Sequence, residues 1–181
     1  MKSKENNVLQ LFFDYPTKEW HFEDIYKEAG IARSKVDNWL KKLIQKKIIM
    51  RVKNKGRMPY YISKYDSSSY RNTKKLFAWS QLHASGFLDH IASLPAKTVI
   101  VFGSFTRSDW YKNSDIDLFV YGGSKKLQLA KYETKLHRDI QVFACQNPQK
   151  LHTLGEGLMK NIIKGNIIKG DIDFVKVQIN A

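Results

Sequence analysis

The stretch TVIVFGSFTRSDWYKNSDIDLFV, residues 98–120, contains the most informative pattern in the chain. Its first five residues form an apolar run that predicts a β-strand, and Gly103 and Ser104 follow directly. Ten residues separate Ser104 from Asp115. Asp115 and Asp117 lie on either side of one isoleucine, at the start of a second apolar run. Residues i and i+2 of a strand point to the same face, so we expect both carboxylates to converge on one small volume.

Two carboxylates this close repel each other unless a cation lies between them. Their hard oxygen atoms favour Mg²⁺, which keeps several waters and takes further ligands from substrate phosphates. Gly103 allows the backbone to approach a phosphate closely, and the hydroxyl of Ser104 can donate to it. The first amides of a short helix after Ser104 would add to this anion site, with Arg107 as a positive charge nearby. The segment therefore predicts a site for a metal ion and a phosphate-containing ligand.

A Gly-Ser pair, ten residues and Asp-x-Asp is similar to the signature of minimal nucleotidyltransferases in the DNA polymerase beta superfamily, and the string GSFTRSDWYKNSDIDLFV fits it without a gap. The resemblance covers about residues 76–170. It implies a mixed β-sheet flanked by helices, and transfer of a nucleoside monophosphate from an NTP, expected to be ATP, to a hydroxyl acceptor. A pair of Mg²⁺ ions would bind Asp115 and Asp117. The nucleotide-binding residues that it implies are Gly103, Ser104, Arg107 and Ser114.

The resemblance also implies a third catalytic carboxylate on the next strand, which we expect at residues 140–144. Aligning the apolar residues of that strand puts Gln141 at the position, where it offers a carbonyl oxygen and no negative charge. Asp139, two residues earlier on the same face, is the other candidate. Two hypotheses stay open: an active transferase, or a catalytically degenerate regulator whose transferase-like domain only binds nucleotide or mediates assembly. A second Asp-x-Asp at residues 171–173 lacks a preceding Gly-Ser pair and is interpreted as structural.

The charge of the chain is strongly basic and unevenly distributed. The 31 Lys and Arg residues exceed the 17 Asp and Glu residues, for a net charge of +14. Residues 1–75 contain 18 basic and 8 acidic residues, whereas residues 76–181 contain 13 and 9. Such a polarised excess predicts an anionic partner, with nucleic acid the leading candidate, contacted mainly by the N-terminal part.

The first 63 residues read as three helices followed by a hairpin, an order similar to that of winged helix-turn-helix domains. The third helix is expected to start near Ser34 and to turn Val36, Leu40, Leu43 and Ile44 inward. A basic, glycine-containing turn at residues 53–57 would form the wing. The residues predicted to bind DNA are Arg33, Ser34, Lys35, Asn38, Lys41, Lys42, Lys53, Lys55 and Arg57.

These patterns predict an α+β protein with a winged helix-turn-helix domain at residues 1–65 and a nucleotidyltransferase domain at residues 96–181. Residues 66–95 would form a linker and one long helix, from about residue 70 to residue 93, which also offers a surface for a homodimer. A closing helix is expected at residues 151–164.

Other functional classes are excluded or disfavoured by the sequence. No apolar run approaches the ~18–20 residues of a membrane span, and the first residues do not resemble a signal peptide, so we expect a cytoplasmic protein without a membrane partner. The single cysteine, Cys145, excludes an intramolecular disulfide and a cysteine-rich zinc site. Some members of the family that the motif resembles act as antitoxins that modify a hydroxyl side chain of a partner toxin, so a partner protein is one expected acceptor. A nucleic acid and a small molecule are the alternatives.

Overall fold

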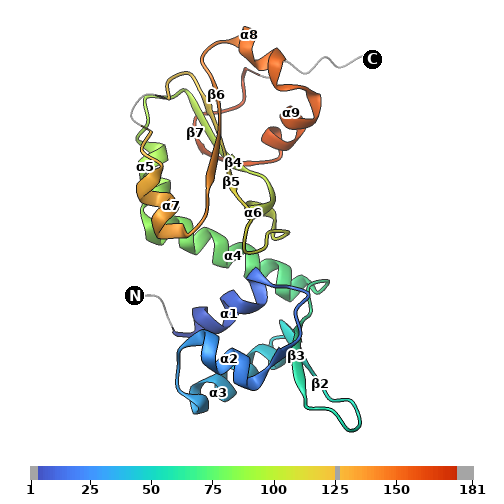
Figure 1. Ribbon diagram of the computed structural model, residues 1–181. Helices are drawn as coiled ribbons and strands as arrows, with labels where there is room; N and C mark the ends of the chain where they lie inside the picture. The colour runs from blue at the N-terminus through green and yellow to red at the C-terminus, as the bar shows by residue number, and fades with distance from the viewer. Residues whose placement is uncertain (1–3, 125–126, 175–181) are drawn as a thin grey trace. The chain divides into compact units, whose positions relative to one another are not determined.

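The computed structural model describes residues 4–124 and 127–174, so the outer ends of the two predicted domains lie outside the described residues. The chain divides into two compact units (Figure 1). The first unit holds the residues up to Leu76 together with Trp110–Asn113, and the second holds Phe77–Asp109 and the residues from Ser114 onward. Within the described ranges, no helix combines the length and apolarity that a membrane crossing requires.

The first unit contains three helices, a three-stranded antiparallel sheet and the first half of a fourth helix. The sheet order is β1–β3–β2, so the short strand after the first helix pairs with the second strand of the hairpin. The elements are α1 (Lys4–Asp14), β1 (Trp20–His21), α2 (Phe22–Ala29), α3 (Arg33–Gln45), β2 (Ile49–Val52), β3 (Tyr60–Ser63) and α4 (Ser68–Ser85).

The turn between α2 and α3 depends on a glycine. Gly30 adopts a left-handed conformation with φ of +61°, which ends α2 and redirects the chain. Along α3, Val36, Leu40 and Leu43 are buried at helical spacing as expected. Ile44, also expected to face inward, is 36% exposed, because it lies about 100° around the helix from Leu43.

The core of the first unit includes a buried lysine and a segment distant in sequence. Lys74 on α4 is only 1% exposed, and its ammonium donates to the carbonyl oxygen of Trp110. The indole ring of Trp110 is itself buried and packs edge-on against Phe13, with ring centroids 6.1 Å apart. The same segment is also bonded to the end of α1, because the backbone amide of Lys112 donates to the carbonyl of Asp14 at 3.0 Å. Residues 110–113 are therefore fixed within the first unit, although they lie between Ser104 and Asp115 in the sequence.

The helix predicted from residue 70 to residue 93 is divided in the structure into α4 and α5 (Phe87–Ala92). Gly86 separates them with φ of +77°, a left-handed conformation that interrupts the helical hydrogen-bond ladder. Leu76 of α4 is 71% exposed although it is apolar. Apolar residues recur at helical spacing on both sides of Gly86, from Leu82 to Phe87 and Ile91, so the periodicity gives no sign of the break.

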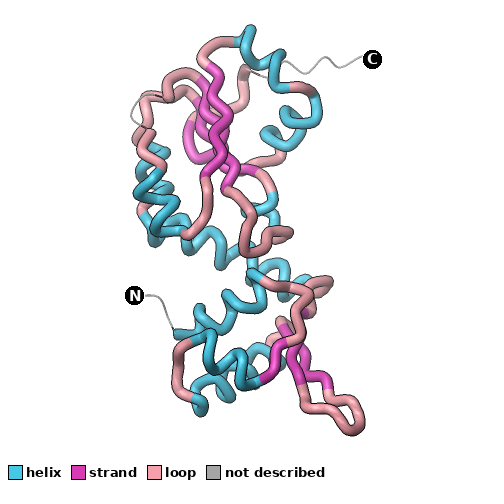
Figure 2. The backbone as a smooth tube through the Cα atoms, in the orientation of Figure 1, coloured by secondary structure: helices cyan, strands magenta, loops and turns pink. Residues whose placement is uncertain are grey.

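The second unit is built on a four-stranded mixed sheet in the order β6–β5–β4–β7. Figure 2 shows its strands in magenta. β5 pairs antiparallel with β4 and parallel with β6, and β7 pairs antiparallel with β4. Figure 1 shows α5 and α7 on one side of the sheet and α9 on the other. The elements are β4 (Thr98–Phe102), α6 (Ser104–Arg107), β5 (Ile116–Tyr121), α7 (Ala130–Leu136), β6 (Ile140–Cys145), α8 (Pro148–Leu151), η1 (His152–Leu154), α9 (Glu156–Ile163) and β7 (Asn166–Lys169). The expectation of an α+β protein with a mixed sheet flanked by helices is confirmed.

The prediction of one continuous closing helix at residues 151–164 is wrong, because the segment is divided into shorter helices. Gly155, with φ of +73° and ψ of 151°, separates the short helices α8 and η1 from α9. Side chains from α8 and α9 then pack on the sheet, where Leu151 and Ile162 join Ile100, Phe102 and Phe119 in one buried cluster. This cluster covers the part of the sheet next to the carboxylates described below.

Candidate functional site

The two motif aspartates lie at the start of β5 in the second unit. Asp117 is half-buried within the strand, and Asp115 directly precedes the strand and is exposed. The sheet register places Asp117 opposite Phe102 of β4 on one side and opposite Gln141 of β6 on the other. Residues directly opposite each other share one face of a sheet, so these side chains form a row across three strands.

Gly103 is in close contact with this row. Its φ of +80° is left-handed, and a Cβ built on it would lie 1.8 Å from Oδ2 of Asp117. Only glycine fits this position, because any side chain would overlap the carboxylate. Ser104 then begins the four-residue helix α6, and Thr106 donates its hydroxyl back to the carbonyl oxygen of Gly103 at 3.2 Å. The glycine-serine turn and the Asp-x-Asp segment, ten residues apart, are thus brought together.

The carboxylates form an unfavourable pair in the absence of a cation. Burial raises the pKa of Asp117, the negative charge of Asp115 raises it further, and the positive charge of Arg107 acts in the opposite direction. Arg107 is itself exposed, with its Nε atom 3.4 Å from Oδ2 of Asp109. A hard divalent cation with retained waters, such as Mg²⁺, fits the half-buried carboxylate of Asp117 together with the exposed carboxylate of Asp115 just before the strand.

The third position of the site is occupied by an amide. Gln141 is exposed in β6 and lies in register with Asp117, the position that the apolar pattern of the strand predicts. Asp139 lies just before β6, and its backbone carbonyl accepts a hydrogen bond from the amide of Ile116 at 2.9 Å. Among residues 4–124 and 127–174, no group of three or more His, Cys, Asp or Glu side chains is arranged to hold a metal ion. The available ligands are therefore the two motif carboxylates and the carbonyl oxygen of Gln141.

Arg138 is a residue of this region that sequence reasoning missed. It is 9% exposed, and its guanidinium donates to the carbonyl oxygen of Ser114 at 2.9 Å. The guanidinium carbon also lies 5.0 Å from the ring centre of Phe105 in α6. One side chain thus contacts both the residue before Asp115 and the helix after Gly103. An arginine next to an aspartate at a strand start gives no sequence signal of such a role.

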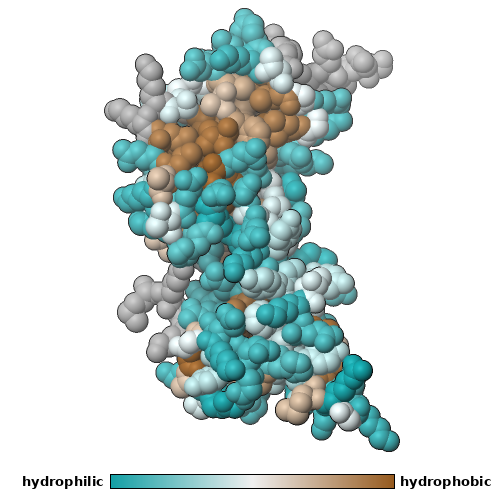
Figure 3. Space-filling view, in the orientation of Figure 1, coloured by the Kyte–Doolittle hydropathy of each residue, from teal (hydrophilic) through white to brown (hydrophobic). Residues whose placement is uncertain are grey.

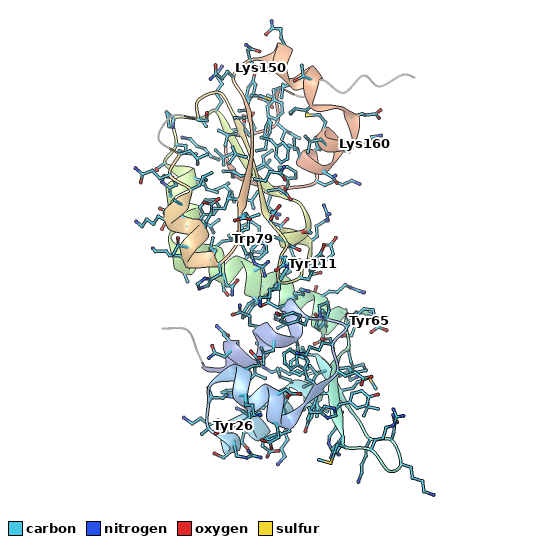
Figure 4. The ribbon with its side chains drawn as sticks, in the orientation of Figure 1. Tyr26, Tyr65, Trp79, Tyr111, Lys150 and Lys160 are labelled. Carbon is cyan, nitrogen blue, oxygen red and sulfur yellow. The ribbon has the colours of Figure 1, made fainter. Side chains whose placement is uncertain are left out.

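The residues predicted to bind DNA lie on α3 and the β2–β3 loop of the first unit, and all nine are exposed. Two of them are engaged in ion pairs: Arg33 donates through both terminal nitrogens to Glu23, and Lys41 Nζ lies 2.7 Å from Oδ2 of Asp37. The Arg33 guanidinium also lies over the ring of Tyr26, labelled in Figure 4, at 5.0 Å.

The other residues predicted to bind DNA lie on α3 and on the β2–β3 loop. The ammonium of Lys42 lies 4.3 Å from the centre of the Trp39 ring. Lys35 and Asn38 are exposed on the same helix. Figure 1 shows the β2–β3 loop, with Lys53, Lys55 and Arg57, extending away from the helices of its unit.

Comparison with known families agrees with the geometry of the second unit. Residues 93–175 match the family model described as polymerase beta, nucleotidyltransferase. The match supports a nucleotidyltransferase domain. It spans β4, the glycine-serine turn, both motif aspartates and β6, so it contains every residue of the candidate site. Searches of curated proteins and of solved structures gave no significant match.

Proposed function

We propose that the second unit transfers a nucleoside monophosphate from an NTP, expected to be ATP, to a hydroxyl acceptor in a Mg²⁺-dependent reaction. The observation that carries this proposal is the contact between Gly103 and the Asp117 carboxylate, within a segment that matches a nucleotidyltransferase family. It puts a backbone turn suited to phosphates directly beside the group suited to a metal ion.

The chain's own residues have distinct roles in this proposal. Asp115 and Asp117 would hold the metal ions, with Gln141, in register with Asp117, as a neutral oxygen ligand. The backbone at Gly103 and Ser104 binds the triphosphate, while Arg107 and Ser114 are nearby donors. Bound Mg²⁺ supplies charge neutralisation at the attacking and leaving oxygens.

The bonds that change follow from the chemistry of the donor. The acceptor oxygen forms a bond to the α-phosphorus, and the bond from that phosphorus to the oxygen bridging to the β-phosphate breaks. Pyrophosphate departs with the bonding electrons, and the hydroxyl proton passes to solvent. Arg138 acts as a positioning residue, because it fixes the backbone of Ser114 next to Asp115 and contacts Phe105 of α6.

For the first unit we propose a winged helix-turn-helix domain that binds DNA. The element order of helix, strand, helix, helix, strand, strand, with a three-stranded antiparallel sheet, supports this. Exposed Lys35 and Asn38 on α3 would contact base edges, and the cations of the β2–β3 loop would contact phosphates.

A second candidate function is a DNA-binding regulator whose transferase-like unit binds nucleotide without transferring it. The observation that favours it is Gln141, an uncharged residue in register with Asp117 at the third position of the site. Such a protein would still bind nucleotide through the glycine-serine turn, but it would not transfer the nucleotide to an acceptor.

The first test is calorimetry of ATP and GTP binding with and without Mg²⁺, followed by transfer of α-labelled nucleotide. The proposal expects Mg²⁺-dependent binding by the wild-type protein and none by the double variant Asp115→Asn/Asp117→Asn. The matched control is Asp171→Asn/Asp173→Asn, which makes the same change in the second Asp-x-Asp and should bind as wild type. Nucleotide binding that survives in the Asp115/Asp117 variant would contradict the assigned site.

A further inference from the structure

The strand that carries Gln141 is at the edge of the sheet. In the order β6–β5–β4–β7, β6 pairs with β5 on one side, and no other strand of the described residues pairs with its second side. An unpaired edge presents backbone donors and acceptors to any extended chain that approaches it. The outer side of β6 is therefore a surface on which another polypeptide can add a strand.

The hydrogen-bond pattern identifies the open backbone groups. The carbonyls of Asp139 and Cys145 accept from β5-side amides, which shows that odd-numbered residues of this strand bond toward β5. The amides and carbonyls of Val142 and Ala144 consequently point outward. At the start of the strand, the outward amide of Ile140 is already bonded to the carboxylate of Glu133 at 3.1 Å. In the described part of the chain, the open groups are the carbonyl of Ile140 and the amides and carbonyls of Val142 and Ala144.

β6 itself carries no charged side chain, and Gln141 contributes its one polar amide. Residues 140–147 contain no charged residue and no proline before Pro148. Exposed edge strands commonly carry lysine, proline or a bulge that prevents pairing. β6 contains neither lysine nor proline. Figure 3 shows brown, apolar surface on the face of the second unit where β6 lies in Figure 1, and Val142 and Phe143 are only half-buried.

The direction of the proposed reaction points to the same edge. The leaving pyrophosphate would be held at Gly103 and Ser104, beyond the end of β4, and the α-phosphorus would lie near Asp117 on β5. Displacement at phosphorus is in line, so the attacking oxygen approaches from the side opposite the leaving group. Across the row of Phe102, Asp117 and Gln141, that side is β6.

From these observations we propose that the acceptor is a serine, threonine or tyrosine hydroxyl on an extended polypeptide segment that pairs with the outer edge of β6. The inference rests on the proposed nucleotidyl transfer and specifies its acceptor class. An added strand lies about 4.8 Å beyond β6 and continues the row past Gln141. The hydroxyl oxygen bonds to the α-phosphorus, pyrophosphate leaves with the bonding electrons, and the proton passes to solvent.

The test uses the full chain with Mg²⁺ and α-labelled ATP. The acceptor probes are a library of short peptides with a fixed central serine, threonine or tyrosine, and an RNA oligonucleotide with a free 3′ hydroxyl. Val142→Pro removes one outward amide, and Val142→Ala is the matched control that keeps it. Proline is tolerated at an edge position whose amide faces solvent. We expect wild type and Val142→Ala to label peptides, and Val142→Pro to do so about tenfold more slowly.

A second arm removes the hydrogen bonds from the peptide side, in case Val142→Pro does not fold. A labelled peptide resynthesised with alternate N-methylated backbone amides should lose labelling by the wild-type protein. Three results would each overturn the inference. The N-methylated peptide is labelled as fast as the unmodified one, a folded Val142→Pro labels peptides as fast as Val142→Ala, or the RNA is labelled and no peptide is. The absence of any labelled acceptor while Mg²⁺-dependent ATP binding is intact would also overturn it. Loss of ATP binding itself by the wild-type protein would instead overturn the proposed function on which the inference rests.

Discussion

Gly103 and Asp117 approach so closely that a Cβ on Gly103 would lie 1.8 Å from Oδ2 of Asp117. The contact joins the end of β4 to the second residue of β5, whose backbones are paired through Phe102 and Asp117. No side chain separates the backbone of Gly103 from the carboxylate of Asp117. A phosphate bound to this backbone would therefore lie next to a metal ion bound to the carboxylate.

Gly103→Ala should remove nucleotide binding and destabilise the second unit. The new methyl group overlaps the carboxylate, and alanine at φ of +80° is strained, for a cost of about 1–3 kcal/mol. Calorimetry with Mg²⁺ and ATP, together with thermal unfolding, would measure both effects. Gly157→Ala on α9 is the matched control, since its added methyl meets nothing within 4 Å. That control should bind nucleotide normally, and unchanged binding by Gly103→Ala would contradict the contact.

Asp117→Asn should stabilise the metal-free protein at neutral pH while it removes the response to Mg²⁺. Burial and the charge of Asp115 raise the pKa of Asp117, so the folded state favours the protonated form. That contribution is complete below the ordinary aspartate pKa and is lost as the pH rises through the raised value. The melting temperature of the variant should therefore exceed that of wild type at neutral pH, and the gap should close in acid.

The same melting experiment with added Mg²⁺ gives the functional half of this prediction. Mg²⁺ binds the folded wild-type protein and should raise its melting temperature, whereas Asp117→Asn should show no increase. Asp173→Asn, a change at another exposed aspartate, should behave as wild type throughout. If Asp117→Asn melts at a lower temperature than wild type at neutral pH without metal, the proposed repulsion between the carboxylates of Asp115 and Asp117 is contradicted.

Arg138→Met should weaken Mg²⁺-dependent ATP binding through the two segments that the arginine contacts. Removing the guanidinium deletes a charged hydrogen bond to the Ser114 carbonyl, a loss of about 1.5–3 kcal/mol, and ends the contact with Phe105. Arg138→Lys keeps the charge and should restore part of the affinity, which a purely packing role would not produce. The control is Lys135→Met, which removes a different cation that donates to a backbone carbonyl, that of Ser85. Equal ATP affinity in Arg138→Met and wild type would exclude the positioning role.

The sheet strands of the candidate site were predictable from sequence because they are continuous apolar runs. The strand expected at residues 98–102 has the bounds of β4. The strands expected at residues 116–120 and 140–144 each end one residue before β5 and β6 do. The juxtaposition of Asp117 and Gln141 followed from aligning those runs, since register is set by which residues face inward.

The features that sequence did not reveal depend on contacts between distant segments. Trp110 looks like part of the motif spacer, yet it is buried beside Phe13 and Lys74 in the first unit. No periodicity encodes that attachment, because it involves a loop with no regular structure. From sequence, Gly86 is predicted only to weaken a continuous helix. In the structure its left-handed φ divides the helix in two.

The proposed DNA surface should separate into a base-reading part and a phosphate-binding part. Lys35→Ala/Asn38→Ala should abolish sequence preference in duplexes selected from a randomised pool, while salt-sensitive binding remains. Replacing Lys53, Lys55 and Arg57 by alanine should lower affinity for all sequences and reduce the salt slope by about 2–3, because each lost phosphate contact contributes roughly 0.9. Lys160, labelled in Figure 4 and paired with Glu156 on α9, provides the control Lys160→Ala. A salt slope unchanged in the loop variant would contradict its phosphate contacts.

Gln141→Glu should distinguish the two candidate functions of the second unit. The substitution keeps the shape of the side chain and adds a third carboxylate in register with Asp117. Without metal, the added charge repels Asp117 and should lower the melting temperature. With Mg²⁺, an extra charged ligand should tighten ATP binding by about tenfold, since ligand charge sets the affinity of such sites. Gln146→Glu, just beyond β6 and also exposed, is the matched control and should change neither quantity.

Transfer of labelled nucleotide by the same variants then decides between an enzyme and a regulator. If the wild-type protein is an active transferase, both it and Gln141→Glu will label an acceptor, with the variant equal or faster. A wild-type protein that binds Mg²⁺ and ATP without transfer, alongside an active Gln141→Glu, would identify Gln141 as the cause of a lost activity. In that case the second unit acts by binding nucleotide, because one neutral amide stands where the reaction needs a charged ligand.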